Sequence, residues 1–476
     1  MIKPQLLKIL VALMVLVLLF ANLAFASDIQ TKAVQESTDN FGPFGTLHIY
    51  KNSDQPKNVV LFISGDGGWN LGVIDMARSL VALDSMVVGI DITHYIKQLN
   101  ASREKCSYSA AHFEALSQYL QKKYQFQQYT PPVLVGYSSG ATLVYATLAQ
   151  SPPNTFAGGI SMGFCPDLKT SKPLCRGSGT LDSKPDAKLG FIYSPALTLA
   201  AKLYVLQGDA DQVCSTFDTK NFLSKANNAE LIELAKVGHG FSVEKNWMPQ
   251  FKDAFQKITV SQQPLQKSTR ISTELDDLPL VELPTKTNSG TLALMVSGDG
   301  GWAGIDKQVA EALNKKGVAV VGLNSLHYFW TKKNPDIAGK DLTRILNYYS
   351  KAWKAEKLIL IGYSTGADTL PFMVNRLPEL LKSKVQTVAL LGLAKAANFE
   401  FHVADWLYSS DGIYKVIPEV EKLKGMNVMC IYGEDETDNA CSSLDKASFN
   451  LIEMKGVHHF AGDYDKLASI ILTHAN

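Results

Sequence analysis

The stretch that decides the fold is "GYSTGAD", residues 362–368. It follows the apolar run KLILI (357–361), which predicts a buried strand, and it precedes a segment with helical spacing. The pattern predicts a serine on a tight turn between strand and helix, because the flanking glycines let the chain turn sharply. The same turn occurs earlier as "GYSSGAT" (136–142), again after an apolar run. One chain therefore carries this serine turn twice.

Three further islands of sequence repeat in the same order around the two serine turns. The matched pairs are "ISGDGGW" (63–69) with "VSGDGGW" (296–302), "QGDADQVCS" (207–215) with "YGEDETDNACS" (432–442), and "KVGHGF" (236–241) with "KGVHHF" (455–460). A repeat of this length is a duplicated domain, because solenoid units span only about 20–50 residues. We predict a signal peptide at 1–26, an N-terminal domain at 27–259, a linker with an edge strand at 260–289 and a C-terminal domain at 290–476.

Within each copy, short apolar segments alternate with amphipathic ones. In the second copy the expected strands are 292–296, 319–323, 358–361, 385–391 and 428–432, with helical spacing at 306–316 and 341–353. This alternation predicts a mostly parallel, doubly wound sheet. A Gly-x-Ser-x-Gly turn between strand and helix is the nucleophile elbow of the α/β-hydrolase fold. We therefore expect an α/β protein built as a tandem duplication of an α/β-hydrolase domain.

Catalysis by the turn serine needs a histidine that takes its proton and a carboxylate that orients the histidine. In this fold the three residues follow along the chain as serine, acid and histidine. The candidates are Ser364, Glu436 (alternatives Asp435 and Asp438) and His458 in the second copy, and Ser138, Asp211 and His239 in the first.

The glycine-rich stretch in each copy lies where this fold supplies one backbone N–H to an oxyanion, and the residue after the nucleophile supplies another. The candidate oxyanion residues are Asp299, Gly300 and Thr365 in the second copy, and Asp66 and Ser139 in the first. The alternative is a phosphate-binding loop, but the GK[ST] of a P-loop does not follow the glycines.

Charge and the amino terminus bear on partners and location. Lys plus Arg number 46 against 45 Asp plus Glu, so no excess of positive charge attracts nucleic acid. Residues 1–26 combine early lysines, an apolar run at 9–21 and the small-x-small site AFA, which predicts a cleaved export signal; an uncleaved membrane anchor is the alternative. Export favours disulfides within each half. Cys430 then pairs with Cys441, while the four cysteines of the first half allow three connectivities.

The motifs resemble the VirJ/AcvB family of exported bacterial virulence-associated proteins. The second half carries "SGDGGW", "LHYFWTKKNPD" (326–336), "GYSTGAD" and "GVHHF", and the first half carries "GDGGWN", "GYSSGA", "GFCPDL" and "VGHGF". Two copies behind an export signal look like the longer, AcvB-type member. The resemblance implies a periplasmic serine hydrolase that cleaves the aminoacyl ester of lysyl-phosphatidylglycerol, with Ser364 as nucleophile and His458 as base.

Such a substrate suggests further site residues. We expect acidic loop residues, among them Glu434, Asp336 and Asp299, to meet the lysyl amine, and the aromatic segment with Tyr328 and Trp330 to form a lid or to rest on the membrane surface. The first copy lacks this segment, so we expect Ser364 to carry most of the hydrolysis. No cofactor or metal is expected. The alternatives are a binding or escort role in type IV secretion, and an esterase or lipase that acts on another lipid ester.

Overall fold

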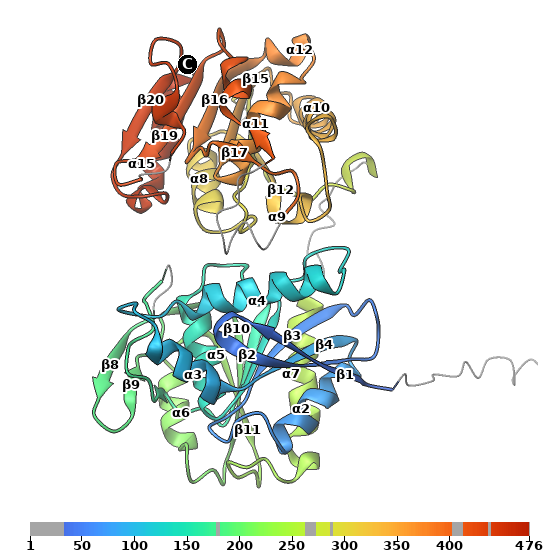
Figure 1. The fold of residues 1–476 in the computed structure, drawn as a ribbon, viewed down its shortest axis with the longest axis vertical. Coiled ribbons are helices and arrows are strands. Elements are labelled where there is room, and N and C mark those ends of the chain that lie inside the picture. Colours follow the sequence, from blue (N-terminus) through green and yellow to red (C-terminus); the bar gives the residue numbers. More distant parts are fainter. Residues whose placement is uncertain are drawn as a thin grey trace, which may run out of the picture.

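The computed structural model describes residues 33–177, 181–261, 273–285, 289–401, 413–436 and 439–475. It consists of two α/β domains, each built on one large sheet (Figure 1). The predicted signal peptide and Asp438 lie outside the described residues.

The N-terminal domain has an eight-stranded sheet of order β1-β2-β4-β3-β5-β6-β10-β11. The β1–β2 and β2–β4 pairs are antiparallel and all later pairs are parallel, which is the arrangement of the α/β-hydrolase fold. The strands are β1 (Gln35–Phe41), β2 (Gly45–Lys51), β3 (Asn58–Ile63), β4 (Ser85–Ile90), β5 (Val133–Tyr137), β6 (Gly158–Met162), β10 (Thr198–Gly208) and β11 (Asn227–Leu234). A small sheet joins β7 (Asp167–Leu168), β9 (Gly190–Tyr193) and β8 (Ser183–Asp186). The helices are α2 (Gly72–Val81), α3 (Ile92–Ala101), α4 (Ser109–Lys123), α5 (Ser139–Gln150), α6 (Thr216–Leu223) and α7 (Met248–Ser261).

The C-terminal domain repeats this plan with seven strands, in the order β12-β14-β13-β15-β16-β19-β20. Only the edge strand β12 runs antiparallel to its neighbour. The strands are β12 (Leu280–Leu283), β13 (Thr291–Val296), β14 (Ala319–Leu323), β15 (Lys357–Tyr363), β16 (Val385–Leu391), β19 (Val428–Gly433) and β20 (Asn450–Met454), with β17 (Ala396–Ala397) and β18 (Tyr414–Lys415) paired apart. The helices are α8 (Gly304–Lys315), α9 (Ser325–Tyr328), α10 (Pro335–Ala352), α11 (Thr365–Asn375), α12 (Glu379–Lys382), α14 (Ile417–Glu421) and α15 (Tyr464–His474).

Both sheets are covered by helices on two faces. Each domain accordingly has two hydrophobic clusters, one on either side of its sheet. The central strands are apolar along their whole length because both of their faces are buried; Leu292 through Val296 of β13 are all 0% exposed. The predicted doubly wound parallel sheets are confirmed.

Three disulfides pair all six cysteines. They are Cys106–Cys175 and Cys165–Cys214 in the N-terminal domain and Cys430–Cys441 in the C-terminal domain. The expectation that pairing stays within each half is confirmed, and the structure selects one of the three connectivities left open for the first half. Within the described part of the chain, no helix is both long enough and apolar enough to cross a membrane.

The two domains meet along α4, which lies on the side of the N-terminal domain that faces the C-terminal domain (Figure 1). Trp330, just after α9, is the centre of this contact and is 2% exposed. Its indole N–H donates to the carbonyl oxygen of Phe126 at 2.7 Å, and the Lys122 ammonium lies 4.6 Å from its ring centroid. Tyr129, Leu326 and Phe401 form an apolar cluster with the indole.

Candidate active sites

Both turn serines occupy strained nucleophile elbows. Ser138, between β5 and α5, has φ 56° and ψ −122°, and Ser364, between β15 and α11, has φ 51° and ψ −122°. A non-glycine residue is rarely found in this region, and the strain lifts the side chain out of the sheet. Each turn can close only because the residue two positions after the serine is glycine. A Cβ at Gly140 would lie 2.5 Å from the Ile63 carbonyl oxygen, and one at Gly366 would lie 2.0 Å from the Val296 carbonyl oxygen.

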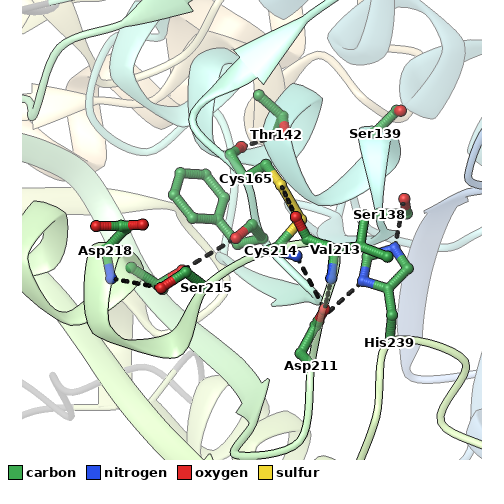
Figure 2. Close-up of a disulfide and its surroundings, with 12 residues drawn as sticks. Ser138, Ser139, Thr142, Cys165, Asp211, Val213, Cys214, Ser215, Asp218 and His239 are labelled. Atoms are coloured by element: carbon green, nitrogen blue, oxygen red, sulfur yellow. Dashed lines mark hydrogen bonds and ion pairs between the residues drawn. A yellow bond between two sulfur atoms is a disulfide. The ribbon is translucent and has the colours of Figure 1, made fainter.

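The N-terminal domain contains a fully connected triad (Figure 2). Ser138 Oγ lies 3.0 Å from His239 Nε2, and His239 Nδ1 lies 2.8 Å from Asp211 Oδ2. The Asp211 side chain is fully buried and the His239 side chain is 17% exposed. The three candidate residues of the first copy are thus brought together in the order that catalysis by a serine hydroxyl requires.

Asp211 is held rigidly by its own loop. One carboxylate oxygen accepts hydrogen bonds from the backbone N–H groups of Val213 and Cys214, at 2.8 and 2.9 Å. The other accepts from Gln207 Nε2 at 3.0 Å as well as from His239. The Cys165–Cys214 disulfide ties this acid loop to the loop after β6, as Figure 2 shows. The acid is therefore fixed before any substrate arrives.

The C-terminal domain assembles the acid and the histidine. Glu436 Oε1 lies 2.6 Å from His458 Nδ1, and the second oxygen of Glu436 accepts from the Gly433 backbone N–H at 3.2 Å. Among the described residues, no hydrogen bond joins Ser364 Oγ to His458. The alternative acid Asp435 is exposed, and its neighbour Glu434 accepts from the Gly456 N–H at 3.4 Å. Glu436 is the acid in hydrogen-bond contact with the histidine.

The glycine-rich loops lie against the serine elbows. A Cβ at Gly65 would lie 3.0 Å from Ser138 Cβ, and one at Gly298 would lie 3.5 Å from Ser364 Cβ. Ser139 and Thr365 are the first residues of α5 and α11, where a backbone N–H has no acceptor within its own helix. Both sites therefore offer free N–H groups beside the serine. In the first site, Ser139 Oγ donates to exposed Asp66 at 2.6 Å.

Buried carboxyl groups distinguish the second site from the first. Burial raises the pKa of Asp299, and the nearby His458 opposes this rise. Burial also raises the pKa of Asp306 and of Asp368 well above the usual range of an aspartate. Asp368 accepts from the Ala394 N–H at 2.7 Å, and Asp306 from the Gly298 N–H at 3.3 Å. The second site is thus a region of several weakly solvated acids.

The other predicted substrate residues lie elsewhere. Trp330 belongs to the domain interface, where the N-terminal domain buries it, so the interface role replaces the predicted contact with substrate. Tyr328 is also buried, and its hydroxyl donates to Asp341 at 2.7 Å. Asp336 is paired with Arg376 at the start of α10. The aromatic segment is therefore a structural element between the domains.

Contacts from the N-terminal domain to the second site could not be predicted from the sequence. Asn154 Nδ2 donates to the carbonyl oxygen of Trp302, which ends the glycine-rich loop of the second site, at 2.9 Å. Glu114 on α4 interacts electrostatically with Asp299 of the same loop. The hydrogen bond joins residues 148 positions apart in the sequence, and no local sequence pattern predicts such an interaction.

The fold defines a pair of α/β-hydrolase domains, and the first of them has a serine, a histidine and an aspartate connected by hydrogen bonds. The chain belongs to the bacterial virulence protein (VirJ) family, whose model matches residues 57–158 and 290–476, more than half of the chain. The match includes the candidate residues Ser364, Glu436 and His458 of the second domain and Ser138 of the first.

Solved structures similar to this chain cover about one domain of it. An esterase domain from Rhodothermus marinus is 14% identical, with a TM-score of 0.33, over 48% of this chain and 98% of that one. A serine α/β hydrolase without a lid from Xanthomonas campestris is 18% identical, with a TM-score of 0.31, over 49% of this chain and 96% of that one. Est1E from Butyrivibrio proteoclasticus is 11% identical, with a TM-score of 0.32, over 48% and 99%. No curated protein matches the chain.

Proposed function

We propose that the protein is a serine hydrolase that cleaves carboxylic esters by acyl transfer to serine and then to water. The observation that carries this proposal is the hydrogen-bonded series Ser138, His239 and Asp211, with the serine on a strained elbow. Ser138 Oγ lies 3.0 Å from His239 Nε2, and His239 Nδ1 lies 2.8 Å from Asp211 Oδ2. Strain at the serine is costly, by about 1–3 kcal/mol, and a protein that only binds partners has no use for it.

The geometry supplies each step of the reaction. Ser138 Oγ bonds to the ester carbonyl carbon while His239 Nε2 accepts the hydroxyl proton, and Asp211 stabilises the resulting imidazolium. Backbone N–H groups, that of Ser139 among them, hold the oxyanion. The histidine then gives the proton to the leaving alcohol. A water molecule, deprotonated by the same histidine, next attacks the acyl-serine and releases the acid.

In the second site, Ser364, His458 and Glu436 have the same roles in this proposal. The missing Ser364 to His458 hydrogen bond does not count against them, because such bonds often tighten only when substrate binds. The family model matches this domain from residue 290 to its end, whereas its match to the first domain stops at residue 158. This supports Ser364 as the nucleophile for the family's substrate.

For that substrate we propose the aminoacyl ester of lysyl-phosphatidylglycerol, with free lysine and phosphatidylglycerol as products. Membership of the VirJ family and the acids around Asp299 support a cationic acyl group. The three disulfides fit an exported protein, and the proposal places the enzyme in the periplasm, at the membrane surface. Contacts with type IV secretion components are the competing proposal.

The test measures lysine released from lysyl-phosphatidylglycerol in mixed micelles by the mature protein and by Ser364→Ala, Ser138→Ala and the double variant. We expect Ser364→Ala to remove most of the release and the double variant to remove all of it. Equal losses from the two single variants would contradict the assignment to Ser364. Full release by the double variant would refute a serine hydrolase, and no release by folded wild-type protein would point to another ester or to the secretion role.

A further inference from the structure

The α4 helix of the N-terminal domain has two buried faces. Ala110, Phe113, Leu116 and Leu120 pack into the core of their own domain. Ala115 and Gln118 lie outside that cluster, yet they are only 3% and 2% exposed. Something other than the N-terminal core therefore covers the opposite face of the helix.

The C-terminal domain supplies this cover. Glu114, Gln118 and Lys122 follow one another at intervals of four, so they form one stripe along α4, about 6 Å apart per step. At one end of the stripe, the Lys122 ammonium donates to the carbonyl oxygen of Trp330 and lies over its ring. At the other end, Glu114 interacts with Asp299. Lys122 therefore contacts the second domain directly, the electrostatic interaction with Asp299 indicates that Glu114 lies near its glycine-rich loop, and Gln118 lies between them on the helix.

Two carboxyl groups at this interface, those of Glu114 and Asp299, have no ion-pair partner among the described residues, although Asp299 accepts a hydrogen bond from the Gly300 backbone N–H. Gln118 Oε1 is buried and accepts no hydrogen bond. Burial, followed by the charge of Asp299, raises the pKa of Glu114 to about 8. Two half-buried carboxyl groups and a buried amide oxygen therefore lie in one region of the interface, while the cation of the stripe, Lys122, donates to the Trp330 carbonyl oxygen instead.

An ammonium group is the ligand that fits these acceptors. It carries one positive charge and three N–H donors, whereas a phosphate would bring further negative charge to the same place. Asp299 belongs to the glycine-rich loop that packs on Ser364, and it interacts with His458. The acceptors are therefore close enough to the second catalytic centre to bind part of an acyl chain that is attached there.

We propose that the second active site is shared between the domains, and that Glu114 of the N-terminal domain binds the side-chain ammonium of a lysyl group held at Ser364, with Gln118 Oε1 and Asp299 as further acceptors. This rests on the proposed function and adds to it the residue that distinguishes lysyl from uncharged aminoacyl groups. The first site has no such partner, since its corresponding Asp66 is exposed and bonded to Ser139.

The test uses the mature full-length chain with Ser138→Ala, so that the hydrolysis measured comes from Ser364 alone. Hydrolysis of lysyl- and alanyl-phosphatidylglycerol is compared for the parent, Glu114→Gln, Glu114→Asp and the control Glu104→Gln, whose side chain is exposed on the same domain. We expect Glu114→Gln to lower the lysyl-to-alanyl ratio of kcat/KM by about tenfold, which corresponds to about 1.4 kcal/mol, through a higher KM for the lysyl lipid. Glu114→Asp should retain part of the preference, and Glu104→Gln all of it.

A second measurement does not depend on lipid hydrolysis. Lysinamide and norleucinamide differ only by the terminal ammonium, and each is tested for its ability to slow labelling of Ser364 by a fluorophosphonate. We expect lysinamide to protect more strongly, and Glu114→Gln to abolish the difference. Equal protection by both amides, or an equal loss of both lipid activities in Glu114→Gln, would overturn the shared site. Unequal protection without hydrolysis of either lipid would support the ammonium site while refuting the lipid substrate.

Discussion

Replacing Trp330 by alanine should uncouple the two domains. The indole is 2% exposed, its N–H donates to the Phe126 carbonyl oxygen at 2.7 Å, and its ring centroid lies 5.3 Å from that of Tyr129. Both of these contacts cross the domain interface. Truncating a buried tryptophan costs about 3–5 kcal/mol, and here much of that loss falls on the association of the domains. The population in which the domains are separated should rise about 10²–10⁴-fold.

Differential scanning calorimetry on the full chain checks this prediction. We expect the wild-type domains to unfold in one coupled transition and Trp330→Ala to resolve two. The matched control is Trp353→Ala, at the end of α10, whose ring packs on Tyr349 within the C-terminal core. That variant should destabilise its own domain without separating the transitions. If Trp330→Ala keeps one transition, or behaves like Trp353→Ala, the interface is not coupled through Trp330 and the cover over the second site must be held by other contacts.

Three further predictions concern the sites and the cores. With Ser364→Ala in the background, Asp211→Asn should lower hydrolysis of p-nitrophenyl acetate by about 10⁴-fold, because the amide favours the wrong tautomer of the catalytic histidine; a loss below tenfold in kcat would contradict the triad. Replacing Cys165 and Cys214 together by serine removes a cross-link of sequence separation 49, so urea unfolding should show a loss of about 4 kcal/mol, and an unchanged midpoint would refute this. Asp306 has a raised pKa because it is buried, so the folded state holds its proton longer than the unfolded state and stability falls as pH rises above the unfolded value. Asp306→Asn should therefore gain stability relative to wild type as the pH rises above the unfolded pKa of 3.8, and a stability difference between the two proteins that stays constant with pH would disagree.

Local patterns in the sequence were enough to predict the sheets and the candidate serine, acid and histidine of each domain. A run such as 292–296 is apolar at every position, which is compatible only with burial on both faces, and it forms β13. The spacing of Glu436 from Gly433 identified the carboxylate that contacts His458, although Glu434, Asp435 and Asp438 belong to the same loop. Comparison of the two copies also favoured His458 over its neighbour, because the first copy has a single histidine there.

The role of Trp330 and the position of Glu114 were beyond the reach of those patterns. An aromatic residue between a short helix and two lysines has the same local sequence whether it is a lid, a membrane contact or an interface anchor. What decides its role is Phe126, about 200 residues away, whose backbone oxygen accepts its N–H. Glu114 is likewise one polar residue on an amphipathic helix, and only the docking of a second domain brings it near Asp299.

The two copies differ less in their catalytic machinery than in the charge around it. Thr142, four residues after the first serine, donates its hydroxyl proton to the Cys165 carbonyl oxygen in the loop after β6. Asp368 occupies the same place after Ser364 and accepts from Ala394 N–H in the equivalent loop, so the contact is retained while a buried acid is gained. Because the Thr142 hydroxyl makes the equivalent contact in the first domain, that contact alone does not explain a carboxylate at position 368. The cationic acyl group proposed for the second site supplies an explanation, since its charge offsets the cost of keeping carboxylates away from water, and the first site, where a hydroxyl stands in place of Asp368 and Asp66 is exposed, should prefer uncharged acyl groups.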